Sequence, residues 1–113
     1  VSIFIYNILT YYYLLIWFMY KEIEKKAIEV SGLLKILSHE KRLWILCLLI
    51  EREKNISQLQ ETLEISQSLV SQFALKMRDQ WILENRKEGK EVIYVLKDKK
   101  IVDLMKAIKT IYC

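Results

Sequence analysis

The stretch that decides the fold is ISQLQETLEISQSLVSQFALKMRDQWILENRKEGKEVIYVL, residues 56–96. Near its start, Ser57 and Gln60 have the S-x-x-Q spacing of a capping box, in which each side chain satisfies a free backbone donor of a helix N-terminus. The helix that they open is expected to run to about Glu64. The dipeptide Ile65–Ser66 then forms a turn, and Ser66 is the natural N-cap of the next helix.

The next helix is predicted over residues 67–80, because its apolar residues recur at steps of three and four. The opposite face near the N-terminus carries hydroxyl and amide side chains, namely Gln67, Ser68, Ser71 and Gln72. Such side chains can reach the edges of DNA bases without bringing a desolvated charge. Lys76, one turn further along, is the basic residue that we group with them.

A β-hairpin is predicted next, with residues 82–87 pairing with residues 91–96. Gly89 supplies the positive φ that the connecting turn requires. Three basic residues cluster at the tip, Arg86, Lys87 and Lys90, where they could contact DNA phosphates beside the groove. Helix, turn, helix and hairpin in this order predict a winged helix-turn-helix, which places one helix in the major groove.

The remaining segments complete a mainly α fold of about five helices with a two-stranded wing. Residues 21–37 have the spacing of an amphipathic helix, and Ser38 is a candidate N-cap for the helix that follows. That second helix, to about Arg52, is apolar nearly all round and is expected to be buried at the centre. A last amphipathic helix begins at about Asp98. Its broad apolar stripe, with that of the first helix, predicts a homodimer interface, so residues 21–113 form the DNA-binding and dimerisation domain.

Length and composition allow one domain with a modest core. The net charge of +4 favours an anionic partner only weakly, since 14 acidic residues are mixed with 18 basic ones. Cys47 and Cys113 are too few for the disulfide scaffold of a secreted mini-protein, and a cytoplasmic location is expected. No Cys-x-x-Cys motif, glycine-rich phosphate loop or nucleophile with a nearby histidine suggests an enzyme.

Residues 1–20 contain no charged side chain and are dominated by aliphatic and aromatic residues. This length would suffice to cross a bilayer as a helix, with Lys21, Lys25 and Lys26 on the cytoplasmic side. Two other interpretations stay open. The chain starts with Val and Met19 stands in frame, so the segment could be an over-extended reading of the gene. It could also be an additional packed helix.

Three motifs resemble the ArsR/SmtB family of bacterial winged-helix repressors. They are LKILS, KRL and IL at residues 34–38, 41–43 and 45–46; ISQSLVSQ at 65–72; and RKEGK at 86–90 with Val92, Tyr94 and Leu96. The resemblance covers about eighty residues in the family's order and implies binding of an operator in double-stranded DNA. Two positions depart from the family pattern. Phe73 replaces a basic or histidine residue, and Trp81 replaces a glycine, so the turn at Trp81 is expected to differ.

The family resemblance also bears on the signal that is sensed. Metal-sensing members carry ligands in the third or last helix, where this chain offers only Asp103, and His39 is expected to be a surface residue. No metal or other cofactor is therefore expected. Cys47 and Cys113 instead match the thiol-based branch, in which a reactive sulfur species or an oxidant links two cysteines and DNA is released. There are two alternatives to a thiol-responsive repressor: a metal-responsive repressor of the same family, and a membrane-tethered helical protein that does not bind DNA.

Overall fold

The computed structural model describes residues 2–113, which fall into two compact units divided between Lys35 and Ile36. The N-terminal unit is a single helix, since α1 (Ser2–Leu37) continues through residue 20 without a break and ends just inside the second unit. Helical structure therefore begins well before residue 21, where the amphipathic helix was predicted to start. The Ser31–Gly32 pair does not interrupt it.

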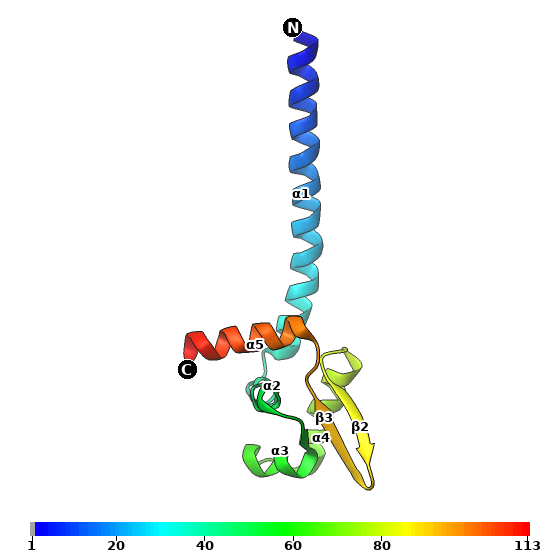
Figure 1. The fold of residues 1–113 in the computed structure, drawn as a ribbon, viewed down its shortest axis with the longest axis vertical. Coiled ribbons are helices and arrows are strands. Elements are labelled where there is room, and N and C mark those ends of the chain that lie inside the picture. The colour runs from blue at the N-terminus through cyan, green and yellow to red at the C-terminus, as the bar shows by residue number, and fades with distance from the viewer. Residues whose placement is uncertain (1) are drawn as a thin grey trace. The chain divides into compact units, whose positions relative to one another are not determined.

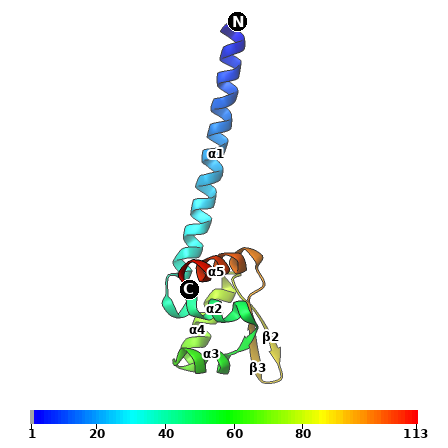
Figure 2. The same ribbon diagram turned by 60° about the vertical axis from the view of Figure 1, so that its left-hand side comes forward.

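The C-terminal unit contains the other four helices and a three-stranded antiparallel sheet (Figures 1 and 2). Its elements in chain order are α2 (Glu40–Glu51), β1 (Lys54–Asn55), α3 (Ile56–Leu63), α4 (Gln67–Asp79), β2 (Glu84–Glu88), β3 (Glu91–Val95) and α5 (Lys99–Tyr112). Five helices and a hairpin wing confirm the winged helix-turn-helix fold.

The strand β1 was not predicted, because two residues are too few to show an alternating pattern. It pairs with the inner wing strand, Lys54 opposite Tyr94 and Asn55 opposite Ile93, which gives the sheet the order β1-β3-β2. Because α3 begins directly after β1, this pairing connects the wing to the helix-turn-helix.

The core of the unit is apolar and is shared by every helix and by β3. Its most deeply buried members are Ile45, Leu46, Leu59, Leu63, Val70, Met77, Tyr94 and Met105. The prediction that α2 is buried all round is wrong for the single chain. Trp44 is exposed and Cys47 is only partly covered, because α5 and α3 contact only part of the surface of α2.

Two predicted helix starts are displaced in the structure. The capping box of α3 is formed by Asn55 and Gln58 rather than by Ser57 and Gln60: Asn55 Oδ1 accepts from the Gln58 amide at 2.8 Å, and Gln58 Oε1 accepts from the Asn55 amide at 2.9 Å. Asn55 still has the extended backbone of β1, so the helix can begin at the next residue. Likewise His39, not Ser38, caps α2 by accepting from the Lys41 amide at 3.1 Å.

Three residues with positive φ close the tight connections of the unit. Gly89, with φ 62°, lies in the wing turn as predicted, and Glu64, with φ 56°, ends α3. Trp81, with φ 62°, stands between α4 and the wing. The expectation that the turn changes where the family favours glycine is thus wrong, because the tryptophan adopts the left-handed conformation itself.

Candidate nucleic-acid interface and cysteine pair

The helix-turn-helix is formed by α3, a connection at residues 64–66, and α4. Ser66 caps α4 as predicted, its hydroxyl accepting from the Leu69 amide at 3.1 Å. Burial of Val70, Ala74 and Met77 then fixes the rotation of α4 about its axis. The opposite face of the helix must consequently point away from the core.

That outward face carries the residues predicted to contact DNA. Gln67, Ser68, Gln72 and Lys76 are exposed, and Ser71 is half-buried. Within residues 2–113 the side chains of these five residues form no hydrogen bond or ion pair, so their donors and acceptors are available to a ligand. Phe73 lies instead on the buried side, where its ring contacts that of His39 with centroids 4.6 Å apart. The absence of a polar residue at this position therefore removes nothing from the outward face.

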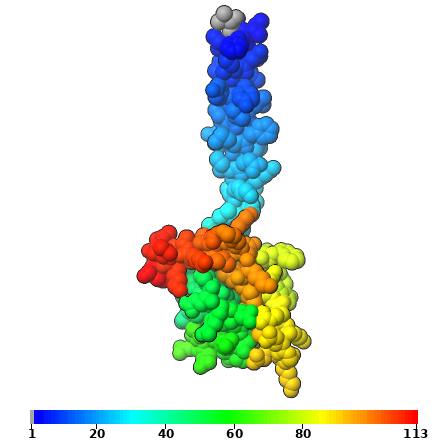
Figure 3. All heavy atoms as spheres, in the orientation of Figure 1, coloured from blue at the N-terminus to red at the C-terminus, as the bar shows by residue number. Residues whose placement is uncertain are grey.

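The wing is a two-stranded ribbon, with β2 in yellow and β3 in orange in Figure 1, and its yellow atoms project at the lower right of the C-terminal unit in Figure 3. Glu88 pairs with Glu91, so the turn itself consists of Gly89 and Lys90. Lys87 and Lys90 are exposed and have no ion-pair partner among the described residues. Both cations are free to meet a phosphate.

Arg86 differs from these two lysines because it is held by two carboxylates. Its guanidinium donates to both oxygens of Glu53, one of them at 2.7 Å, and to Glu88 at 3.0 Å. The hydrogen bonds from Arg86 lower the pKa of Glu53, and those to Glu53 and Glu88 raise the pKa of Arg86. Glu53 lies between α2 and β1, so this cluster links the wing to the entry of the helix-turn-helix.

A cleft joins the outward face of α4 to the wing. Its walls are formed by Ser71, Leu75 and Arg78 of α4 and by Asn85, Arg86 and Lys87 of β2. The structure thus brings the predicted helix residue Ser71 and the predicted wing residue Lys87 to one surface. Leu75, an exposed apolar residue here, was assigned no role from the sequence.

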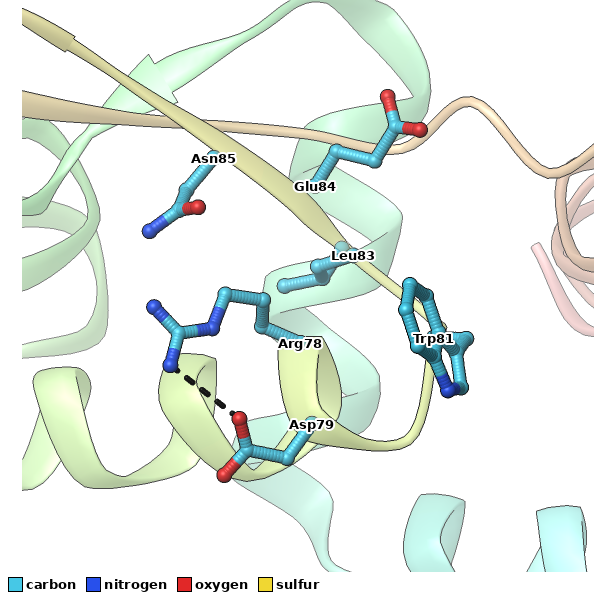
Figure 4. A pocket seen from close by; sticks show the side chains of 6 residues that line it. All are labelled: Arg78, Asp79, Trp81, Leu83, Glu84 and Asn85. Carbon is cyan, nitrogen blue, oxygen red and sulfur yellow. Dashed lines mark hydrogen bonds and ion pairs between the residues drawn. The ribbon is translucent and has the colours of Figure 1, made fainter.

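A second pocket lies where α4 leads into the wing, and Figure 4 shows the six side chains that line it. Arg78 and Asp79 form an ion pair of 3.2 Å on one side, while Trp81, which is 88% exposed, stands on the other. None of the residues predicted to bind DNA lines this pocket. It marks the strained junction between α4 and the wing rather than a part of the outward face.

The two cysteines are free thiols on neighbouring helices, Cys47 partly buried on α2 and Cys113 exposed after α5. Lys109 of α5 forms an ion pair of 3.2 Å with Glu51 of α2. Cys47 precedes Glu51 by one helical turn, and Cys113 follows Lys109 by one turn. Helices packed in an antiparallel register around this ion pair would therefore bring the cysteines toward each other.

Electrostatics supports this proximity. Burial raises the pKa of Cys47, the neighbouring Cys113 raises it further, and Lys109 opposes both effects. Burial therefore disfavours the thiolate form of Cys47. Residues 2–113 hold no group of three His, Cys, Asp or Glu side chains placed to bind a metal ion, and His39 serves as a helix cap.

The fold and the outward face of α4 define a winged-helix DNA-binding protein, and comparison with known proteins identifies its family. A family model described as "Bacterial regulatory protein, arsR family" matches residues 39–80. The Biofilm growth-associated repressor of Xylella fastidiosa is 38% identical over 93 residues, 82% of each chain. The Transcriptional activator HlyU of Vibrio cholerae is 33% identical, covering 82% of this chain and 86% of its own. The chain belongs to the ArsR family.

Solved structures agree with this assignment. Reduced HlyU from Vibrio cholerae superposes with a TM-score of 0.78 at 34% identity, covering 81% of this chain and 97% of its own. The transcriptional repressor BigR from Xylella fastidiosa gives a TM-score of 0.76 at 38% identity, covering 82% and 95%. These relatives are regulators of transcription and not enzymes. The protein is accordingly a DNA-binding transcriptional regulator.

Proposed function

We propose that the protein is a homodimeric repressor that binds an inverted repeat in its operator and leaves it when Cys47 and Cys113 become linked. The proposal is supported by two free thiols, Cys47 on α2 and the exposed Cys113 at the end of α5, because these helices contact each other and Cys113 contributes to the raised pKa of Cys47. Repression is chosen because Biofilm growth-associated repressors are among the relatives. The Vibrio cholerae relative is by name an activator, so the sign of regulation is part of what the experiment must test.

Dimerisation is supported by the apolar surface that α5 leaves uncovered. Ile111 is 72% exposed and Tyr112 is exposed as well, while Ile108 is only partly covered. Apolar side chains of α1 beyond residue 20, such as Ile28, are also exposed. One recognition helix reads few bases, whereas a two-fold dimer places two such helices in successive major grooves about 34 Å apart.

The proposed switch is a thiol–sulfur exchange in two steps. Cys113, being exposed, attacks the outer sulfur of a low-molecular-weight persulfide R–S–SH, which forms Cys113–S–SH and releases R–SH. Cys47 then attacks Cys113 Sγ, forming the disulfide and releasing the outer sulfur as H2S. Two electrons pass from the protein thiols to that sulfur. A peroxide would form the same disulfide through a sulfenic acid and release water.

The link would act on DNA through the dimer. A direct disulfide requires Cα atoms within about 7 Å, and a bridge with inserted sulfur relaxes that limit. Either bridge would tie the C-terminus of α5, whose apolar residues we assign to the dimer interface, to α2. A small shift of this helix changes the spacing of the two recognition helices, and both can then no longer fit their grooves.

The experiment measures DNA binding by the full chain in a mild detergent. The probe is a labelled fragment of the promoter upstream of its own gene, with a random duplex of equal length as control. The wild type should prefer the promoter fragment and release it after polysulfide treatment. Cys47→Ser and Cys113→Ser should each bind the fragment but fail to release it. Release in both single variants would exclude the two-thiol switch, and equal binding to both duplexes would exclude an operator in that fragment.

Intact-mass spectrometry separates the effectors in the same samples. Polysulfide treatment of Cys47→Ser should leave Cys113 carrying added sulfur, because the second step is blocked. Peroxide treatment should instead add oxygen. Reporter expression in cells with and without the gene decides between repression and activation.

A further inference from the structure

Residues 2–20 form a continuous exposed apolar surface along α1. Within α1, residues 2–20 carry no charge, and every one of their side chains is exposed. By length and composition this helix could cross a membrane, and none of the apolar window is buried within the protein. Such a surface is unstable in water and needs an apolar environment.

The distribution of the side chains around the helix distinguishes a bilayer from a second protein copy. A helix that pairs in water keeps one polar face for the solvent. Here consecutive residues are large and apolar or aromatic, as in Tyr11–Tyr12–Tyr13 and in Leu14–Leu15–Ile16–Trp17, and all are exposed. Successive residues are about 100° apart, so four in a row surround the axis. No polar face remains along this part of the helix.

The length of the segment also fits. At about 1.5 Å per residue, residues 2–20 extend over about 28 Å, close to the roughly 30 Å hydrocarbon core of a bilayer. Thr10 is one of the few polar residues, and its hydroxyl donates a hydrogen bond to the Tyr6 carbonyl at 2.9 Å. Its polar hydrogen is therefore satisfied inside the helix, as a lipid-facing hydroxyl requires.

Charge returns abruptly at the C-terminal end of the segment. Lys21, Lys25 and Lys26 follow within six residues, and Lys26 forms an ion pair with Glu29 at 3.2 Å. Lys21 Nζ lies 5.8 Å from the centre of the Trp17 ring, an aromatic-and-lysine arrangement typical of a membrane–water interface. Lysines at this end place it on the cytoplasmic side. That is also the side on which a DNA-binding unit must lie.

We propose that residues 2–20 cross the bacterial cytoplasmic membrane once, with residues 21–113 in the cytoplasm, so that this ArsR-family regulator acts from the membrane. The proposal rests on α1 alone. It holds whether or not the cysteine switch operates, and its test does not depend on DNA.

The test compares two double variants of the full chain on one helix. Leu9→Lys/Tyr13→Lys places two charges at the centre of the proposed span, where the side chains are 51% and 73% exposed. Ile23→Lys/Ile28→Lys is the matched control beyond the span, at positions 61% and 68% exposed. All four side chains are exposed in the protein. A bilayer makes the first pair costly for membrane attachment, whereas the second pair lies on the surface assigned above to the dimer and bears on dimerisation, which flotation does not measure.

The readout is flotation of membranes from bacterial cells after washing with alkaline carbonate. Wild type and the Ile23/Ile28 variant should float with the lipid. The floating fraction of the Leu9/Tyr13 variant should fall about tenfold or more. A helical circular-dichroism spectrum of that displaced variant excludes simple misfolding. Wild-type protein that remains at the bottom of the gradient, as aggregate or as a soluble oligomer, would overturn the proposal, as would identical behaviour of the two variants.

Orientation is tested with the exposed thiol of Cys113. A membrane-impermeant maleimide should label wild type in inverted membrane vesicles and not in intact spheroplasts, with Cys113→Ser as the control for labelling at Cys47. Labelling of Cys113 in intact spheroplasts would overturn the proposed orientation.

Discussion

The outward face of α4 and the wing both carry residues predicted to bind DNA, but these residues differ in whether their side chains already have partners within the protein. On α4 the five polar side chains have no partner among the described residues, whereas on the wing Arg86 is held by Glu53 and Glu88. A free side chain can exchange its water for a base or a phosphate. A side chain already bound by carboxylates must first lose those bonds, so its principal contribution is to position the strand that carries it. Position in the sequence does not separate these two cases.

The largest effect is expected on α4. Ser71→Ala/Gln72→Ala should cost about 1–3 kcal/mol per lost base contact and reduce the preference for operator over random DNA. Fluorescence anisotropy with both duplexes measures the two affinities. Gln80→Ala is the matched control, because this exposed amide ends the same helix at its other terminus. An equal loss for both duplexes would mean that the outward face contacts only the backbone of DNA.

The free lysines of the wing should contribute equally to the affinity for any DNA sequence. Lys87→Ala or Lys90→Ala is expected to weaken binding to operator and random DNA alike, because each lysine neutralises a phosphate. The slope of log affinity against log salt concentration should fall by about one for each lysine removed. Lys100→Ala, an exposed lysine in the first turn of α5, should leave the slope unchanged. A loss confined to operator DNA would show that the wing reads bases.

Substitutions at the positive-φ residues of the α4–wing junction and of the wing turn should change the stability of the fold rather than its affinity for DNA. Trp81→Gly should raise the free energy of unfolding by about 1 kcal/mol, since glycine has no Cβ to oppose a positive φ and the exposed indole contributes little packing. Gly89→Ala should lower it by about the same amount, because its φ is also 62°. Urea denaturation measures both changes. A destabilised Trp81→Gly variant would indicate that the indole packs in the complete assembly.

The smallest change in DNA affinity is expected from variants of the Arg86 cluster. Whether Glu53→Gln weakens or strengthens binding shows the role of Arg86. If Arg86 positions the wing, Glu53→Gln should weaken DNA binding slightly, and Glu53→Gln with Arg86→Ala should be no worse than Arg86→Ala alone. If Arg86 bound phosphate directly, removing the carboxylate would free it and strengthen binding. Because the pKa of Glu53 is lowered in the fold, the contribution of the ion pair is present above the ordinary carboxylate range and lost as pH falls through the lowered value. Binding should therefore not change through this cluster between pH 6 and pH 8, roughly.

Local signals determined much of this protein. The apolar spacing of α4, the cap at Ser66, the turn at Gly89 and the start of α5 at Asp98 were all predictable, because each depends on residues within one or two turns of chain. The polar face of α4 follows from the same spacing. The absence of charge from residues 2–20 was also visible in the sequence, because it is a matter of composition alone.

The tertiary structure decided what depends on residues far apart in the chain. The pairing of β1 with β3 places Asn55 at the end of a strand, and this moved the cap of α3 by two residues from its predicted place. Arg86 meets Glu53 across 33 positions, so packing of the sheet, and not the charge of the wing, determines which basic residues stay free. The contact between α2 and α5 brings Cys47 and Cys113 into electrostatic range, where family resemblance alone had implied a pair. Local propensity acts over a few residues, whereas long-range contacts form only when the whole core is buried.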